Sequence, residues 1–241
     1  MTPASLSAAA KTHAVRRTKL PAAVVFDADG VLVDTEPAWA AARGALFNQH
    51  GEEFGEAEDR QTLGTGLAGT AAALTELLGE PDHEDELRDK LLTLLIAEVS
   101  KQPPRPLPGA VELVNELRGR LPIAVASNSP RALLQKSLEA ARLDGLFDAV
   151  LGVDEVPHAK PAPDLYLAAV MCLGADPKHS VAVEDSPAGV TSARGAGLYV
   201  IGIQSLAHVS LKADEVADSL TDPRLRARLG LTASRSAGYA L

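Results

Sequence analysis

The sequence predicts an α/β protein in which a Rossmann-like parallel sheet forms the core and an all-helical domain is inserted after the first strand. Three observations predict this fold. Short apolar runs alternate with helical patterns along most of the 241 residues, as in parallel sheets built from right-handed crossovers. Residues 37–104, by contrast, show helical periodicity without a strand signal. The proline-rich segment 102–109 then returns the chain to the alternating pattern, and its composition makes it a stiff linker.

The core strands are expected at short apolar runs, namely residues 22–26, 123–126, 147–151, 180–183 and 199–203. Two of the helices between them carry start signals, because Ser129 precedes Pro130 and Ser186 precedes Pro187. Serine at the N-cap followed by proline favours a helix start. In the inserted part we expect helices at residues 37–50, 71–78 and 85–99.

These patterns divide the chain into a core, residues 20–36 and 105–231, and a helical cap, residues 37–104. Residues 1–19 are basic and contain no apolar stretch long enough for a secretion signal. They are therefore expected to form a disordered N-terminal extension, and residues 232–241 a mobile tail.

Composition excludes several classes of protein. The net charge of −9 argues against non-specific nucleic-acid binding, so no nucleic-acid partner is expected. Apolar runs all stay below the roughly 18 residues of a membrane span. The single cysteine, Cys172, excludes an intrachain disulfide and is expected to be a small buried residue. It fits a reducing compartment, so we expect a cytoplasmic location. The sequence indicates no oligomeric state and is compatible with a monomer.

Four of the expected strands lead into charged or polar residues: Asp27 and Asp29, Ser127 and Asn128, Lys160, and Glu184 and Asp185. In a parallel sheet these strand ends share one edge, so the groups can converge although they are far apart in sequence. Carboxylates without histidine or cysteine suit a hard cation, with Mg²⁺ the leading candidate. Lysine, serine and backbone amides suit a phosphate. An aspartate beside the cation can attack phosphorus, and a second carboxylate can serve as acid and base.

Two motifs identify a family. Residues 27–36 read Asp-Ala-Asp-Gly-Val-Leu-Val-Asp-Thr-Glu, and residues 184–190 read Glu-Asp-Ser-Pro-Ala-Gly-Val. With Ser127 and Lys160 between them, they resemble the four motifs of the haloacid dehalogenase superfamily, in the order that family shows. The first motif is similar to that of the branch with a helical cap, which includes β-phosphoglucomutase, phosphoglycolate phosphatases and sugar-phosphate phosphatases. The resemblance covers roughly residues 20–220.

The resemblance implies a role for each motif residue. Asp27 would be the nucleophile and Asp29 the general acid and base. Ser127 and Lys160 would contact phosphate, with Asn128 beside them. Mg²⁺ would be held by Asp27, the backbone carbonyl of Asp29 and Asp185, with Glu184 acting directly or through a water molecule.

Several cap residues are candidates for contacts that recognise the substrate. Trp39 can pack against a sugar or anchor the cap. Glu36 can accept a hydrogen bond from a substrate hydroxyl, or favour the helix start through the helix dipole. Gly64 and Thr65 lie where the family keeps a specificity loop, but the same segment can be a plain connector between helices. Arg43 is the cation of the first cap helix that could grip a second phosphate.

We therefore expect a Mg²⁺-dependent phosphatase that hydrolyses a small phosphorylated metabolite, a sugar or polyol phosphate, through an aspartyl-phosphate. The alternatives are a β-phosphoglucomutase-like phosphomutase and a phosphoglycolate-type phosphatase. The mutases usually carry a histidine on the first cap helix near the place of Trp39, which weighs against that alternative. A non-enzymatic binding module would be expected to lack a catalytic group, and each expected group is present.

Overall fold

A computed structural model describes residues 20–62, 66–204 and 210–231. The predicted N-terminal extension, the predicted tail, and the candidate residues Gly64 and Thr65 lie outside the described residues.

The described core contains a six-stranded parallel sheet in the order β5-β4-β1-β6-β7-β8. The central strand β1 places Val25 opposite Ala124 of β4 and Ala182 of β6. The strands are β1 (Val24–Phe26), β4 (Ile123–Ala126), β5 (Ala149–Leu151), β6 (Val181–Glu184), β7 (Tyr199–Ile203) and β8 (Glu215–Ala217). Because β1 lies between β4 and β6, their carboxyl ends come together at one edge of the sheet.

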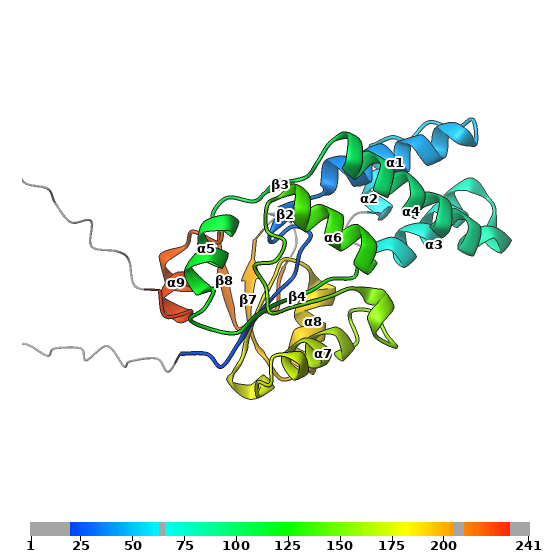
Figure 1. Ribbon diagram of the computed structural model, residues 1–241. Helices are drawn as coiled ribbons and strands as arrows, with labels where there is room; N and C mark the ends of the chain where they lie inside the picture. Colours follow the sequence, from blue (N-terminus) through cyan, green and yellow to red (C-terminus); the bar gives the residue numbers. More distant parts are fainter. Residues whose placement is uncertain (1–19, 63–65, 205–209, 232–241) are drawn as a thin grey trace, which may run out of the picture.

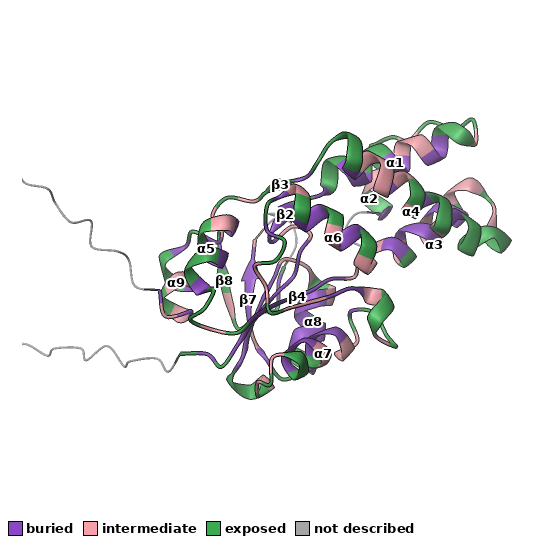
Figure 2. Cartoon of the chain, viewed as in Figure 1, coloured by how far each residue is buried: buried purple, intermediate pink, exposed green. Residues whose placement is uncertain are grey.

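Helices cover both faces of this sheet, as Figure 1 shows. Successive residues of a strand point to opposite faces, so Val24 and Phe26 belong to one apolar cluster and Val25 to another. The first cluster is completed by α5 (Ala110–Leu117), α6 (Arg131–Ala140) and α9 (Pro223–Arg228), and the second by α7 (Asp164–Cys172) and α8 (Pro187–Gly195). Burial on both faces explains why the strands read as continuous apolar runs and appear as buried bands in Figure 2.

Four further helices lie together at one end of the molecule (Figure 1). They are α1 (Glu36–Gln49), α2 (Glu56–Thr62), α3 (Gly66–Leu78) and α4 (Glu84–Lys101). Their apolar cluster includes Trp39, Leu46 and Leu91, and Leu133 of α6 joins it from the core. A short antiparallel pair, β2 (Val33–Asp34) with β3 (Arg105–Pro106), joins the two chain segments that enter and leave this group of helices.

The predicted fold class is confirmed, with some differences in its elements. Helix α3 begins at Gly66, ahead of the predicted start at residue 71. The sequence analysis missed α2, α9, β8 and the pair β2–β3. Helix α2 has the sequence EAEDRQT, which offers no apolar stripe, and a two-residue strand is too short to show a period. The division into domains at residues 37 and 104 stays a prediction.

Three short 3₁₀ turns complete the described elements: Pro81–His83, Val153–Glu155 and Pro177–His179.

Cys172 is exposed, so the prediction that it is buried is wrong. It is the last residue of α7 and stays outside the cluster that buries Leu165, Tyr166 and Ala169 of the same helix. None of the described helices combines the length and the apolar character that crossing a membrane requires.

Candidate active site

A cavity of about 500 Å³ lies between the carboxyl ends of β1, β4 and β6 and the helices α1–α3. Six of the seven predicted strand-end residues line it, since only Glu184 lies behind its wall. The opposite wall is lined by Glu36, Trp39, Arg43, Thr62 and Thr70. The sheet therefore brings together side chains that are up to about 160 positions apart in the chain, as the sequence analysis predicts from the strand ends.

Asp27 and Lys160 form a buried ion pair at the end of β1. The Nζ atom of Lys160 lies 2.6 Å from Oδ1 of Asp27 and 2.5 Å from Oε1 of Glu184. Burial opposes the charge on Lys160, but the two carboxylates outweigh it and hold the pKa of Lys160 above its ordinary value. Burial also raises the pKa of Asp27 well above its ordinary value; Lys160 opposes this rise, and the neighbouring carboxylates add to it.

Hydrogen-bond donors surround the carboxylate of Glu184. Its Oε1 accepts hydrogen bonds from Lys160 and, at 2.8 Å, from the hydroxyl of Tyr166. Its Oε2 accepts from the backbone N–H groups of Asp185 and Ser186 and from Oγ of Ser186. The side chain has no exposed surface, so these bonds replace water as its solvation. Ser186 also caps α8 by accepting a bond from the N–H of Gly189, as predicted.

Two glycines let these loops approach one another. Gly189 packs against Glu184 so closely that a Cβ at this position would lie 1.7 Å from Oε1. Gly30 follows Asp29 with φ +80°, and a Cβ there would lie 2.1 Å from Oδ2 of Asp185. The approach of the β1 and β6 loops therefore depends on the absence of side chains at both positions.

Three hydroxyl groups hold the carboxyl group of Asp29. Thr35 donates to Oδ1 at 2.7 Å, and Ser127 and Ser129 donate to Oδ2 at 3.1 and 2.9 Å. Ser129 was predicted as the N-cap of the next helix, which is wrong: α6 begins at Arg131 with Pro130 in the capping position. Thr35 precedes α1, and its hydroxyl likewise makes no cap. Both hydroxyls are oriented toward Asp29 instead.

Asn128 holds the backbone of Lys160 at both of its polar groups. Its Oδ1 accepts from the N–H of Lys160 at 2.9 Å, and its Nδ2 donates to the carbonyl of Lys160 at 3.2 Å. Asn128 thus fixes the loop that carries the ammonium group. Among the described residues, its second amide hydrogen has no acceptor, so it can serve a ligand in the cavity that Asn128 lines.

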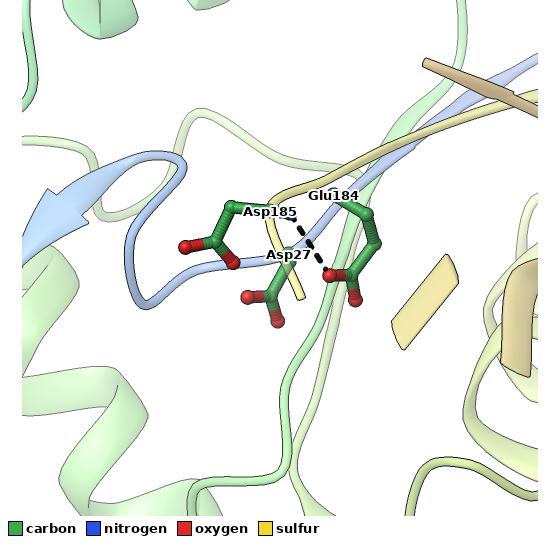
Figure 3. A group of neighbouring side chains, drawn as sticks. All are labelled: Asp27, Glu184 and Asp185. Atoms are coloured by element: carbon green, nitrogen blue, oxygen red, sulfur yellow. Dashed lines mark hydrogen bonds between the residues drawn. The ribbon is translucent and has the colours of Figure 1, made fainter. Parts of the chain in front are cut away.

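Three carboxylates are close enough to share a cation. Asp27, Glu184 and Asp185 each offer an oxygen atom, and these atoms lie within 4.8 Å of one another (Figure 3). Five acidic and two basic residues line the cavity among the described residues, so a bound cation would offset the excess of negative charge. An all-oxygen donor set fits a hard divalent ion. The carboxyl group of Asp29 lies outside this group and contacts the hydroxyls.

Comparisons with known proteins agree with this geometry. A family model described as haloacid dehalogenase-like hydrolase matches residues 21–197. The chain belongs to this family. The prediction made from the motifs is confirmed, and so is the branch with a helical cap that it named.

The relatives of this haloacid dehalogenase-like hydrolase include several phosphatases. Fructose-1-phosphate phosphatase YqaB of Escherichia coli is 30% identical over 185 residues, which cover 77% of the chain and 97% of the relative. The bifunctional riboflavin kinase/FMN phosphatase of Arabidopsis thaliana is 32% identical over 212 residues, covering 86% of the chain but 55% of the relative. The chain thus spans about half the length of that relative. The crystal structure of CbbY from Rhodobacter sphaeroides in complex with phosphate has a TM-score of 0.74 at 26% identity, and the match covers 84% of this chain and 96% of that one.

Three side chains of this hydrolase's site escaped the sequence analysis: Thr35, Ser129 and Tyr166. Ser129 was interpreted as a helix cap, and Thr35 likewise stands directly before a helix, where a hydroxyl suits capping equally well. Tyr166 lies on the buried face of α7, where a tyrosine is interpreted as an ordinary core residue. The apolar stripe of this helix predicts that Tyr166 is buried. A buried phenol needs a hydrogen-bond partner, and this need could have pointed to a polar neighbour. Burial and Glu184 raise the pKa of Tyr166 well above its ordinary value, so the phenol stays protonated and donates.

Gly189→Ala tests the packing around Glu184. The added Cβ would displace the carboxylate and break its bonds to Lys160 and Tyr166, so we expect a loss of about 1–3 kcal/mol in the free energy of unfolding. Urea denaturation measures it. Gly44→Ala is the matched control, since Gly44 lies inside α1 with open space around it and the exchange should be neutral or stabilising. Equal stability of the two variants would contradict the proposed packing.

Proposed function

We propose that the chain is a Mg²⁺-dependent phosphatase that hydrolyses a sugar or polyol phosphate through an aspartyl-phosphate on Asp27. The observation that carries the proposal is the pairing of two carboxyl groups on one turn. Asp27 is buried against Lys160, and Asp29 faces the same cavity from a set of hydroxyls. This arrangement supports the role of nucleophile for Asp27 and the role of acid and base for Asp29.

In the first half of the reaction, a carboxylate oxygen of Asp27 attacks phosphorus while the ester P–O bond breaks. The alcohol oxygen that leaves takes a proton from Asp29. Lys160, which already contacts Asp27, offsets the repulsion between this carboxylate and the phosphate dianion. Ser127 and the remaining amide hydrogen of Asn128 line the cavity as further phosphate donors.

In the second half, Asp29 accepts a proton from water as the water oxygen attacks phosphorus. The P–O bond to Asp27 breaks, and inorganic phosphate leaves. Asp29 must therefore be held both with and without its proton. Hydroxyl groups suit this requirement, because each can rotate to donate to a carboxylate or to accept from a carboxylic acid.

The residues that would hold Mg²⁺ are Asp27, Asp185 and the backbone carbonyl of Asp29, with Glu184 acting directly or through water. Both oxygens of Glu184 already accept protein hydrogen bonds, which favours contact through water. When bound, the ion would neutralise charge on the phosphoryl oxygens. Burial and its acidic neighbours raise the pKa of Asp27, and a bound cation would oppose this rise and favour the ionised nucleophile.

The substrate class is supported by relatives and by the cavity. YqaB is named for fructose 1-phosphate, and phosphatases of validoxylamine A 7′-phosphate and of phosphorylated carbohydrates also match the chain. Trp39 lines the cavity as part of the apolar cluster of α1, α3 and α4, so it can offer a flat surface to a sugar while it anchors these helices. A cytoplasmic location stays a prediction.

Asp27→Asn is expected to lower phosphate release by more than about 10³-fold, because the amide keeps the shape but is no nucleophile. Phosphate release from fructose 1-phosphate with Mg²⁺ measures the effect, and circular dichroism checks the fold. Asp82→Asn, at an exposed position in the turn before α4, is the matched control and should keep full activity. Activity of Asp27→Asn within tenfold of the parent would exclude Asp27 as the nucleophile.

Asp29→Ala is expected to lower the rate on alkyl phosphates by about 10²–10⁴-fold, the range of general acid–base catalysis. The loss should be smaller for p-nitrophenyl phosphate, because nitrophenolate leaves without a proton. Steady-state rates on fructose 1-phosphate and p-nitrophenyl phosphate measure both losses. If the two substrates lose rate equally, Asp29 has no role as the acid.

Removal of metal with EDTA should abolish phosphate release, and added Mg²⁺ should restore it. Ca²⁺ should restore little, because it takes more ligands in a looser geometry. The measurement is phosphate release after dialysis against EDTA and addition of each ion. Full activity in EDTA would rule out the proposed metal dependence.

A further inference from the structure

Tyr166 contacts the carboxylate of Glu184 from behind the wall of the cavity. Its hydroxyl donates a hydrogen bond to Oε1 of Glu184 at 2.8 Å, and Tyr166 is not one of the residues that line the cavity. The residue has no exposed surface. Within the described part of the chain, its hydroxyl donates to no other acceptor. Tyr166 is therefore placed to hold Glu184 and does not itself face a ligand in the cavity.

The ring and the hydroxyl of Tyr166 have separate roles. The ring packs in the apolar cluster of α7 with Leu165 and Ala169, and its centre lies 5.0 Å from Nζ of Lys160. The hydroxyl adds the bond to Glu184 and lies 3.5 Å from the same Nζ atom. A phenylalanine would fill the same space and keep the contacts of the ring. The packing of α7 therefore does not explain the hydroxyl.

Protein donors occupy both oxygens of Glu184. Oε2 accepts three hydrogen bonds from the loop that follows β6, and Oε1 accepts one from Lys160 and one from Tyr166. A carboxylate offers about four lone-pair positions, so five donors leave no free position for an ion. Lys160 also binds Asp27. Among the described residues, Tyr166 is thus the donor to Oε1 that serves Glu184 alone.

Glu184 is nevertheless close enough to take part in cation binding. One of its oxygens lies within 4.8 Å of an oxygen of Asp27 and of an oxygen of Asp185 (Figure 3). Direct contact with an ion at this site therefore requires a free lone pair and no large movement. Removal of the Tyr166 hydroxyl would free a lone pair on Oε1, while Lys160 keeps its own bond to that atom.

The number of carboxylates that touch the ion affects which ion is preferred. Mg²⁺ keeps several water ligands and is usually bound through about one or two carboxylates, whereas Ca²⁺ takes about six to eight oxygen ligands in a flexible geometry. Asp27 and Asp185 already supply two carboxylates. A third carboxylate in direct contact would favour Ca²⁺ over Mg²⁺.

We infer, on the basis of the proposed metal dependence, that Tyr166 is a positioning residue that keeps Glu184 from binding the ion directly. In this arrangement Asp27 and Asp185 are the carboxylates that touch Mg²⁺, and Glu184 contacts it through a water molecule. The hydroxyl of Tyr166 thereby sets the preference of the site for Mg²⁺ over Ca²⁺.

Calorimetric titration of the metal-free protein with Mg²⁺ and with Ca²⁺ tests the inference. In Tyr166→Phe, we expect the Kd for Ca²⁺ to fall by about tenfold relative to the Kd for Mg²⁺, because Glu184 becomes a further direct ligand. Circular dichroism checks the fold of the variant. A merely structural role would change the unfolding midpoint without changing the ratio of the two Kd values, so an unchanged ratio would overturn the inference.

Tyr199→Phe is the matched control. Its hydroxyl also donates to a glutamate, at 3.3 Å to Oε2 of Glu215, but Tyr199 lies outside the cavity lining. This variant should keep the parent's ratio of Kd values. A change of ratio equal to that of Tyr166→Phe would show that loss of any phenol hydroxyl has the effect, and would overturn the role assigned to Tyr166.

A crystal structure of the parent protein with Mg²⁺ decides the point even if Tyr166→Phe does not fold. We expect a water molecule between Glu184 and the ion, with the nearest Glu184 oxygen more than about 3.5 Å away from it. A Glu184 oxygen at about 2.0–2.1 Å, the distance of a direct Mg²⁺ ligand, would overturn the inference.

Failure of the inference and failure of the proposed function give different results. Direct binding by Glu184, or an unchanged ratio in Tyr166→Phe, would leave the Mg²⁺-dependent phosphatase intact and remove the role of Tyr166. If calorimetry detects no binding of either ion to the parent, the proposed metal dependence fails and the inference fails with it. Phosphate release in EDTA would then show whether the chain is a phosphatase that works without a metal.

Discussion

The ammonium group of Lys160 lies between the carboxylates of Asp27 and Glu184, and all three side chains are almost completely buried. Buried charges are stable only when they are paired and hydrogen-bonded, so the surrounding loops must supply the remaining partners. Asn128 fixes the backbone of Lys160, Tyr166 donates to Glu184, and Gly189 leaves room for that carboxylate. Much of the loop structure at this edge of the sheet serves to satisfy one ion cluster.

That cluster remains acidic after every protein contact is made. Burial raises the pKa of Asp27, and the carboxylates of Glu184, Asp185 and Asp29 add to this rise. An excess of negative charge of this kind favours the binding of a cation. The same excess of charge that would destabilise a structural cluster would suit the proposed phosphoryl transfer.

The helical side of the cavity uses a buried cation differently. Lys160 pairs with Asp27 and Glu184 at the strand ends, whereas Arg43 of α1 pairs with Glu36 and with Asp59 of α2. The two ends of the cavity therefore differ in how their charges are paired. In the proposed function, the end at the sheet would take the phosphoryl group and its metal.

The sequence alone determined the fold class, five strands of the core sheet, and the polar groups at the strand ends. Apolar periodicity is a local pattern, and the ends of parallel strands meet at one edge of a sheet, so neither inference needs knowledge of distant contacts. It could not decide between uses of the same residue type. Ser129 and Thr35 resemble caps but donate to Asp29, and Tyr166 resembles a core residue but binds Glu184. The sequence also does not show that Arg43 pairs with Glu36 on its own helix and with Asp59 on another helix. These choices depend on partners far away in the chain, and only tertiary packing fixes which partner is within hydrogen-bond distance.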